Sequence, residues 1–196
     1  MRYEEKFTDY FSKMPIFTFK DASRFLNKMG ASDAYVKLFM HNQAKRKKLH
    51  RVGKGYYTSH DGEEVIGFAF SPFYYGLEYS MTLHKLWSQV SIPVILTATK
   101  AVPGIRNSMG KRIMIRRISK QMFFGIEYIR YNEIFIPVSD IEKTLIDFAY
   151  FGIKLSDNDM KNILCRCNMK KLMEYANRCS KRVNREVVSA ANRIEY

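Results

Sequence analysis

The sequence predicts a mixed α+β protein in which helices occupy both ends of the chain and short strands lie between them. Apolar residues recur at helical spacing up to about residue 46 and again from residue 139 onward. Between these regions, short apolar segments are separated by turn residues, which is typical of strands. The change near Asp61-Gly62 predicts two domains, one over residues 1–60 and an α+β domain over residues 61–196 that ends in helices.

Three helices are predicted in the N-terminal domain, at Tyr3–Lys13, Lys20–Met29 and Ser32–Arg46. Gly30 ends the second helix, because glycine readily adopts the left-handed conformation that follows many helices. Ser32 is a favourable N-cap for the third helix only two residues later. Two helices joined by so short a turn are typical of a helix-turn-helix.

Two short strands are predicted after the third helix, at Leu49–Val52 and Tyr56–Thr58. The segment Gly53-Lys54-Gly55 supplies the turn between them. A helix-turn-helix followed by a small basic hairpin is the order of elements in a winged helix-turn-helix. We therefore expect residues 1–60 to adopt that fold.

The second domain is predicted to begin with strands and to end with helices. The expected strands and the helix between them are Val65–Phe70, Leu77–Trp87 (helix), Val94–Thr97, Arg112–Ile118 and a hairpin from Glu127 to Val138 that turns near Asn132. The expected C-terminal helices are Ser139–Phe151, Asp157–Cys167, Met169–Arg178 and one after Ser180.

The net charge of +14 comes from 33 Lys and Arg against 19 Asp and Glu, and it is unevenly distributed. Residues 1–60 have a net charge of +8, whereas residues 61–110 have −1 and the two later segments, 111–155 and 156–196, have +3 and +4. This concentration of charge in the first third is typical of a nucleic-acid-binding module. A basic surface alone would also suit acidic protein partners or a membrane surface.

The third helix has two different faces when it is drawn at helical periodicity. Its apolar arc contains Leu38, Tyr35, Phe39, Val36 and Met40. The opposite arc contains Lys37, His41, Lys45 and, beyond them, Lys48. A solvated charged face is the simpler interpretation of such a stripe. Its position between a helix-turn and a basic hairpin favours a helix that enters the major groove of DNA.

Roles can be assigned by position within this module. The residues near the start of the third helix are the candidates for contacts with base edges: Ser32, Asp33, Lys37 and His41. Tyr35 is expected to pack in the core. The later basic residues are the candidates for phosphate contacts: Lys45, Arg46, Lys47, Lys48, Arg51 and Lys54.

An enzymatic alternative rests on the segment SDIEKTLID, which offers Asp140, Glu142, Lys143 and Asp147. Acidic residues with a lysine near strands can indicate a metal-dependent nuclease. The segment is explained better as a helix start, in which Ser139 and Glu142 form a capping box. We therefore expect no catalytic residues and no enzymatic activity.

No cofactor or metal site is expected either. Cys165, Cys167 and Cys179 lack a fourth ligand for structural zinc, and the histidines are scattered along the chain. The sequence contains neither a G-x-x-x-x-G-K-[ST] nor a G-x-G-x-x-G motif. Without a signal peptide or a long apolar run, the protein is expected to be cytoplasmic and to have no membrane partner.

Five segments, in this order, resemble the AbiEi family of antitoxins: FTFKDASRFL, LHRVGKGYYT, EYSMTLHKLW, PVILTAT and VSDIEKTLIDFAYF. The resemblance extends from Phe17 to Phe151 and depends on the order of the segments. It departs from the family at the lysine-rich end of the third helix, where members often have Leu and Gly.

The resemblance implies a transcriptional regulator from a phage-defence operon of the abortive-infection type. Such proteins repress their own promoter by binding inverted repeats in double-stranded DNA, and their C-terminal domain carries the antitoxin function. The partner is a nucleotidyltransferase toxin, with which a stable complex is not required. The remaining alternatives are a nuclease delivered by a winged helix and a winged-helix protein unconnected to any toxin.

Overall fold

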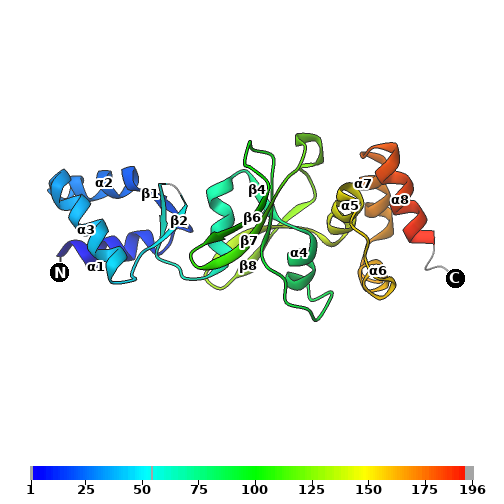
Figure 1. The fold of residues 1–196 in the computed structure, drawn as a ribbon, viewed down its shortest axis with the longest axis horizontal. Coiled ribbons are helices and arrows are strands. Elements are labelled where there is room, and N and C mark those ends of the chain that lie inside the picture. Colours follow the sequence, from blue (N-terminus) through cyan, green and yellow to red (C-terminus); the bar gives the residue numbers. More distant parts are fainter. Residues whose placement is uncertain (1, 54, 193–196) are drawn as a thin grey trace.

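The computed structural model describes residues 2–53 and 55–192 and shows a mixed α+β fold. Figure 1 shows the elements arranged along one long axis, with three helices at one end, a six-stranded sheet in the middle and four helices at the other end. The expected helix-rich N-terminus and C-terminal helices are both present. No helix within the described ranges has the length and apolar character needed to cross a bilayer.

The N-terminal part contains three helices and a small antiparallel sheet. Its elements are α1 (Arg2–Phe11), β1 (Phe17–Thr18), α2 (Phe19–Lys28), α3 (Asp33–Lys45), β2 (His50–Gly53) and β3 (Tyr56–Thr58). Thr18 caps α2, since its side chain accepts a hydrogen bond from the backbone N–H of Asp21 and Asp21 reciprocates. The strand β1 was not expected from the sequence; it pairs with β3 and gives the sheet order β1-β3-β2.

The larger sheet has the strand order β6-β7-β5-β4-β9-β8. Its strands are β4 (Phe73–Tyr75), β5 (Val94–Thr97), β6 (Gly104–Ser108), β7 (Lys111–Arg117), β8 (Ile126–Tyr131) and β9 (Ile134–Ser139). The pairs β5–β7 and β4–β9 are parallel and the others antiparallel. Every residue of the central strands β4 and β5 is buried, so this part of the sheet is covered on both faces.

Helices surround this sheet and continue beyond it. They are η1 (Glu63–Phe70), α4 (Leu77–Leu83), η2 (Lys120–Met122), α5 (Ile141–Phe151), α6 (Asp157–Leu164), α7 (Met169–Asn177) and α8 (Lys181–Asn192). The strand predicted at Val65–Phe70 is wrong, because this segment is part of the 3₁₀ helix η1. The backbone N–H of Gly67 donates to the hydroxyl of Tyr75 at 2.9 Å, and a side chain at Gly67 would collide with the ring of Phe73. The apolar segment thus packs against β4 instead of joining the sheet.

Two hydrophobic clusters form within the described residues. The smaller joins α1, β1, α2, α3 and the residue just before β2, and its buried members include Phe7, Leu26 and Phe39. The larger contains the six-stranded sheet and the helices around it. Val52 belongs to the larger cluster although it lies in β2, and its carbonyl accepts a hydrogen bond from the hydroxyl of Ser108 at 2.5 Å. The hairpin β2–β3 therefore contacts the edge of the large sheet.

Helix α5 begins at a different residue from the one expected. Its N-cap is Asp140, whose side chain accepts a hydrogen bond from the backbone N–H of Lys143 at 2.7 Å. The expected capping box of Ser139 and Glu142 is therefore wrong. Ser139 is the last residue of β9, and its hydroxyl lies 2.9 Å from that of Thr144 inside the core. The sequence places two residues suited to capping side by side, and only the second lies outside the strand.

A fully buried lysine fixes α5 to the sheet. The Lys143 ammonium donates to the carboxylate of Asp147 one turn later and to the hydroxyl of Tyr74 in β4, the latter at 3.0 Å. The Tyr74 hydroxyl in turn donates to Asp147 at 2.9 Å. The ammonium also lies 5.1 Å from the ring centre of Phe124. Burial raises the pKa of Asp147 above its ordinary value, and the lysine beside it opposes this rise.

We expect Lys143→Ala to lower the free energy of unfolding by about 3–5 kcal/mol, because Asp147 would remain in the core without its partner. The double variant Lys143→Met, Asp147→Leu removes both charges and keeps the volume similar, so its loss should be smaller. Urea unfolding of the full chain measures both losses. A double variant as unstable as Lys143→Ala would contradict this account of the pair.

Candidate nucleic-acid interface

The turn between α2 and α3 is held by the side chains of two predicted contact residues. Ser32 caps α3, since its hydroxyl accepts a hydrogen bond from the backbone N–H of Tyr35 at 3.3 Å. The carboxylate of Asp33 accepts a hydrogen bond from the side chain of Asn27 in α2 at 2.8 Å. Both residues are exposed, but these bonds give them a structural role at the start of α3.

Helix α3 has a buried side and an exposed side. The buried side chains are Val36, Phe39, Met40 and Gln43. The exposed side chains directly opposite form a row at i, i+4, i+7 and i+11: Ala34, Leu38, His41 and Lys45. Lys37 is also exposed and lies beside this row, toward Ala44. The basic stripe expected at Lys37, His41 and Lys45 is therefore on the surface.

The apolar arc expected for α3 is too wide. Leu38 and Tyr35 were placed on the apolar side, yet their exposed fractions are 57% and 40%. Only one side of α3 packs against the smaller hydrophobic cluster. The polar Gln43 is buried on that side, although it is not part of the expected apolar arc. The ring of Tyr35 rests against that of Tyr3 with the centres 5.3 Å apart. Leu38 is the exposed side chain of this face that the sequence pattern did not predict.

The basic residues predicted to contact DNA differ in whether an acidic side chain lies beside them. Lys48 forms an ion pair with Glu4 of α1 at 2.6 Å, and Arg46 approaches the same carboxylate at 3.8 Å. The hydrogen bond from Lys48 lowers the pKa of Glu4. Among the described residues, Lys37 and Lys45 have no acidic partner within 4.0 Å. These two lysines are free to meet an anion.

The remaining predicted contacts lie after α3. Lys47 is exposed in the turn that follows the helix and has a left-handed backbone with φ of 58°. Arg51 is exposed on β2, opposite Tyr57 of β3. Lys54, expected at the tip of the hairpin, lies outside the described residues. The hairpin thus adds at least one exposed cation to the module that carries α3.

The acidic residues around α5 are engaged with α7. The Glu142 carboxylate accepts a hydrogen bond from the backbone N–H of Asn168 at 2.7 Å and pairs with Lys171 at 2.8 Å. Asp140 pairs with Lys171 at 3.1 Å and accepts a hydrogen bond from the hydroxyl of Tyr175 at 2.9 Å. Burial alone would raise the pKa of Glu142, but the bonds from Lys171 and Asn168 bring it below its ordinary value. The described residues contain no group of three or more side chains arranged to hold a metal ion.

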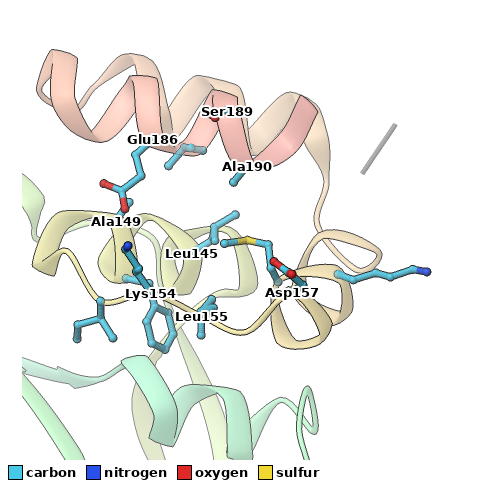
Figure 2. A pocket seen from close by; sticks show the side chains of 13 residues that line it. Leu145, Ala149, Lys154, Leu155, Asp157, Glu186, Ser189 and Ala190 are labelled. Carbon is cyan, nitrogen blue, oxygen red and sulfur yellow. The ribbon is translucent and has the colours of Figure 1, made fainter. Parts of the chain in front are cut away.

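An apolar pocket of about 630 Å³ lies between α5, α6 and α8. Figure 2 shows Leu145, Ala149 and Leu155 lining it, with charged residues around them. Those charges have both signs, and they are Lys154, Asp157, Lys161 and Glu186. The pocket therefore has no preference for an anion, and the helices that line it lie at the opposite end of the molecule from α3 (Figure 1).

No protein-family model matches the chain, and no curated protein sequence matches it significantly.

The acidic contacts of α5 predict a pH-dependent effect of Glu142→Gln. Because the pKa of Glu142 is lowered in the folded state, its contribution to stability is present above the unfolded value of about 4.3 and is lost as the pH falls through the folded value. The variant should be less stable than the parent at pH 7, and this difference should shrink toward pH 3. Glu174→Gln, at an exposed position on α7, is the control and should have little effect. Urea unfolding at both pH values tests this, and a difference that grows on acidification would contradict it.

Removal of the Glu4 carboxylate should strengthen binding to duplex DNA. Glu4→Gln frees Lys48 and Arg46 for phosphates, and an exposed ion pair of this kind contributes little to folding. Glu5→Gln makes the same change in net charge at a neighbouring exposed position without an ion pair among the described residues. Affinity for a 20-base-pair duplex should rise more for Glu4→Gln than for Glu5→Gln. Equal gains would mean that only net charge matters.

Proposed function

We propose that this chain is a DNA-binding antitoxin and transcriptional autorepressor whose residues 1–60 form a winged helix-turn-helix. The observation that carries the DNA-binding part is the exposed face of α3. It presents Lys37, His41 and Lys45 and contains no acidic residue after Asp33. A helix of 13 residues is about 20 Å long, and the major groove of DNA is wide enough to admit it.

The order of elements around α3 supports the winged-helix assignment. Helices α2 and α3 are separated by residues 29–32, and the hairpin β2–β3 follows α3 directly. Strand β1 completes a three-stranded sheet in the order β1-β3-β2. This sheet brings Arg51 into the same module as the exposed face of α3. In a winged helix, the helix approaches base edges while the hairpin contacts the backbone phosphates.

The polar contacts of the turn refine the roles of the individual residues. Ser32 and Asp33 position the start of α3 through their bonds to Tyr35 and Asn27. His41 and Lys45 lie in the outward row, where His41 faces the base edges and Lys45 contacts a phosphate at the groove wall. Lys37 lies beside the row and contacts a phosphate.

The basic residues that follow α3 add phosphate contacts. Arg46 and Lys48 exchange Glu4 for a phosphate when DNA binds. Lys47, Arg51 and Lys54 complete the set. Phosphate contacts of this kind supply affinity and register rather than sequence choice.

The two hydrophobic clusters and the uneven charge support the division into two domains. Residues 1–60 carry a net charge of +8 and bury their own cluster around Phe7, Leu26 and Phe39. We assign DNA binding to these residues and the antitoxin function to residues 61–196. The second assignment rests on the resemblance to AbiEi antitoxins, which also implies a cytoplasmic protein that opposes a nucleotidyltransferase toxin.

Two of the five segments that carry this resemblance meet inside the core. The hydroxyl of Ser80, in the segment EYSMTLHKLW, lies 2.8 Å from that of Thr144, in VSDIEKTLIDFAYF. It also donates to the carbonyl of Ser139 at 3.0 Å. The nuclease alternative has less support, because Lys143 and Asp147 are buried against each other and Asp140 and Glu142 are bound to Lys171.

The test of DNA binding uses two pairs of lysines in the full chain. Lys37→Ala with Lys45→Ala removes two exposed cations from α3. Lys170→Ala with Lys181→Ala makes the same charge change on α7 and α8. With DNA from immediately upstream of its own gene, the first pair should reduce the slope of log affinity against log salt by about 1.8, because each lost contact reduces it by about 0.9. Equal losses in both pairs would contradict the proposed interface.

The same variants separate the two proposed activities. A strain that expresses the adjacent toxin gene should resume growth when the parent or the Lys37→Ala, Lys45→Ala variant is co-expressed. Repression of a reporter behind the upstream DNA should be lost in that variant alone. Failure of the parent to restore growth would overturn the antitoxin assignment and leave the DNA-binding result standing by itself.

A further inference from the structure

The row at the centre of the exposed face of α3 is apolar in its first half. Ala34 and Leu38 come first, and His41 and Lys45 follow toward the C-terminal end. The row lies opposite the buried Val36, Met40 and Gln43, so it is the part of α3 that projects farthest from the smaller hydrophobic cluster. The charged side chain of Lys37 lies to one side of it.

Leu38 is unusual for its position rather than for its exposure alone. Single exposed leucines are common on protein surfaces. This one has an exposed fraction of 57% and occupies the line along which a recognition helix meets DNA. The exposed polar and charged side chains of α3 lie around it, and more than half of its surface is open to solvent.

The major groove offers one apolar group, the C5-methyl of thymine. Guanine, cytosine and adenine present donors and acceptors there, and an apolar side chain over these atoms would remove them from water without a partner. Leu38 and Ala34 are about 6 Å apart along the helix, so each can meet a methyl group within a span of about two base pairs.

We propose that Leu38, with Ala34, reads thymine methyl groups, so that the DNA sequence recognised by this protein carries thymines beneath the N-terminal half of α3. The proposal rests on the proposed function, because it requires α3 to lie in the major groove. It gives the exposed leucine the role of selecting sequence, while Lys37 and the basic residues after α3 supply affinity for any duplex.

The experiment compares two forms of one duplex that differ only in methyl groups. The full chain first selects its preferred sequence from random 30-base-pair duplexes, and that sequence is then made with thymidine or with deoxyuridine. The parent should bind the thymidine form more tightly by about four-fold for each methyl group that it buries. Leu38→Ala should lose about four-fold of this preference and keep only the part that Ala34 supplies. Because Leu38 is exposed and alanine favours helices, this variant should fold like the parent.

Lys45→Ala is the matched control on the same row. It should weaken binding to both forms by the same factor and keep the preference for thymidine. The proposal is overturned if Leu38→Ala keeps the parent's preference, or if the parent binds its selected sequence with no preference for thymidine. A parent that selects no sequence and binds no duplex overturns the proposed function itself, and the proposal with it.

Discussion

The position of the C-terminal helices depends on one buried cation, the ammonium of Lys143. Its bonds to Asp147 and Tyr74 join the first turns of α5 to the central strand β4, and α7 and α8 pack against α5. A charge in this environment is stable only while every partner remains in place. Lys143 and Asp147 both lie on α5, and both are bonded to the Tyr74 hydroxyl of β4. These two bonds favour one position of α5 on the sheet, because a displacement of α5 would break them inside the core.

The N-terminal part uses positive charge in the opposite way. Lys37 and Lys45 project from α3 into solvent without an acidic partner in the described ranges, while Glu4 partly satisfies Lys48 and Arg46. The repulsion among these cations lowers stability slightly and is relieved when an anion arrives. Thus Lys37 and Lys45 of the N-terminal part are exposed and have no acidic partner among the described residues. Lys143 of the second part is buried and paired with Asp147.

Local signals in the sequence located most of the elements. The cap Ser32 marked the start of α3, because capping depends on neighbouring residues alone. The assignment failed where distant contacts decide: Val65–Phe70 is helical because it packs against β4, and the two-residue strand β1 exists only through β3. For the candidate interface, the pattern identified α3 and its lysines. It could not identify Leu38 as exposed, because the direction of the core around α3 depends on how α1 and α2 pack.

The contact between Val52 and Ser108 has a consequence for communication through the molecule. Val52 belongs to the hairpin β2–β3, yet its side chain is buried in the larger cluster and its carbonyl is bound to the edge strand β6. The hairpin cannot shift without exposing this side chain or breaking this bond. Any movement of the hairpin is therefore coupled mechanically to the edge of the large sheet through this one side chain and this one bond.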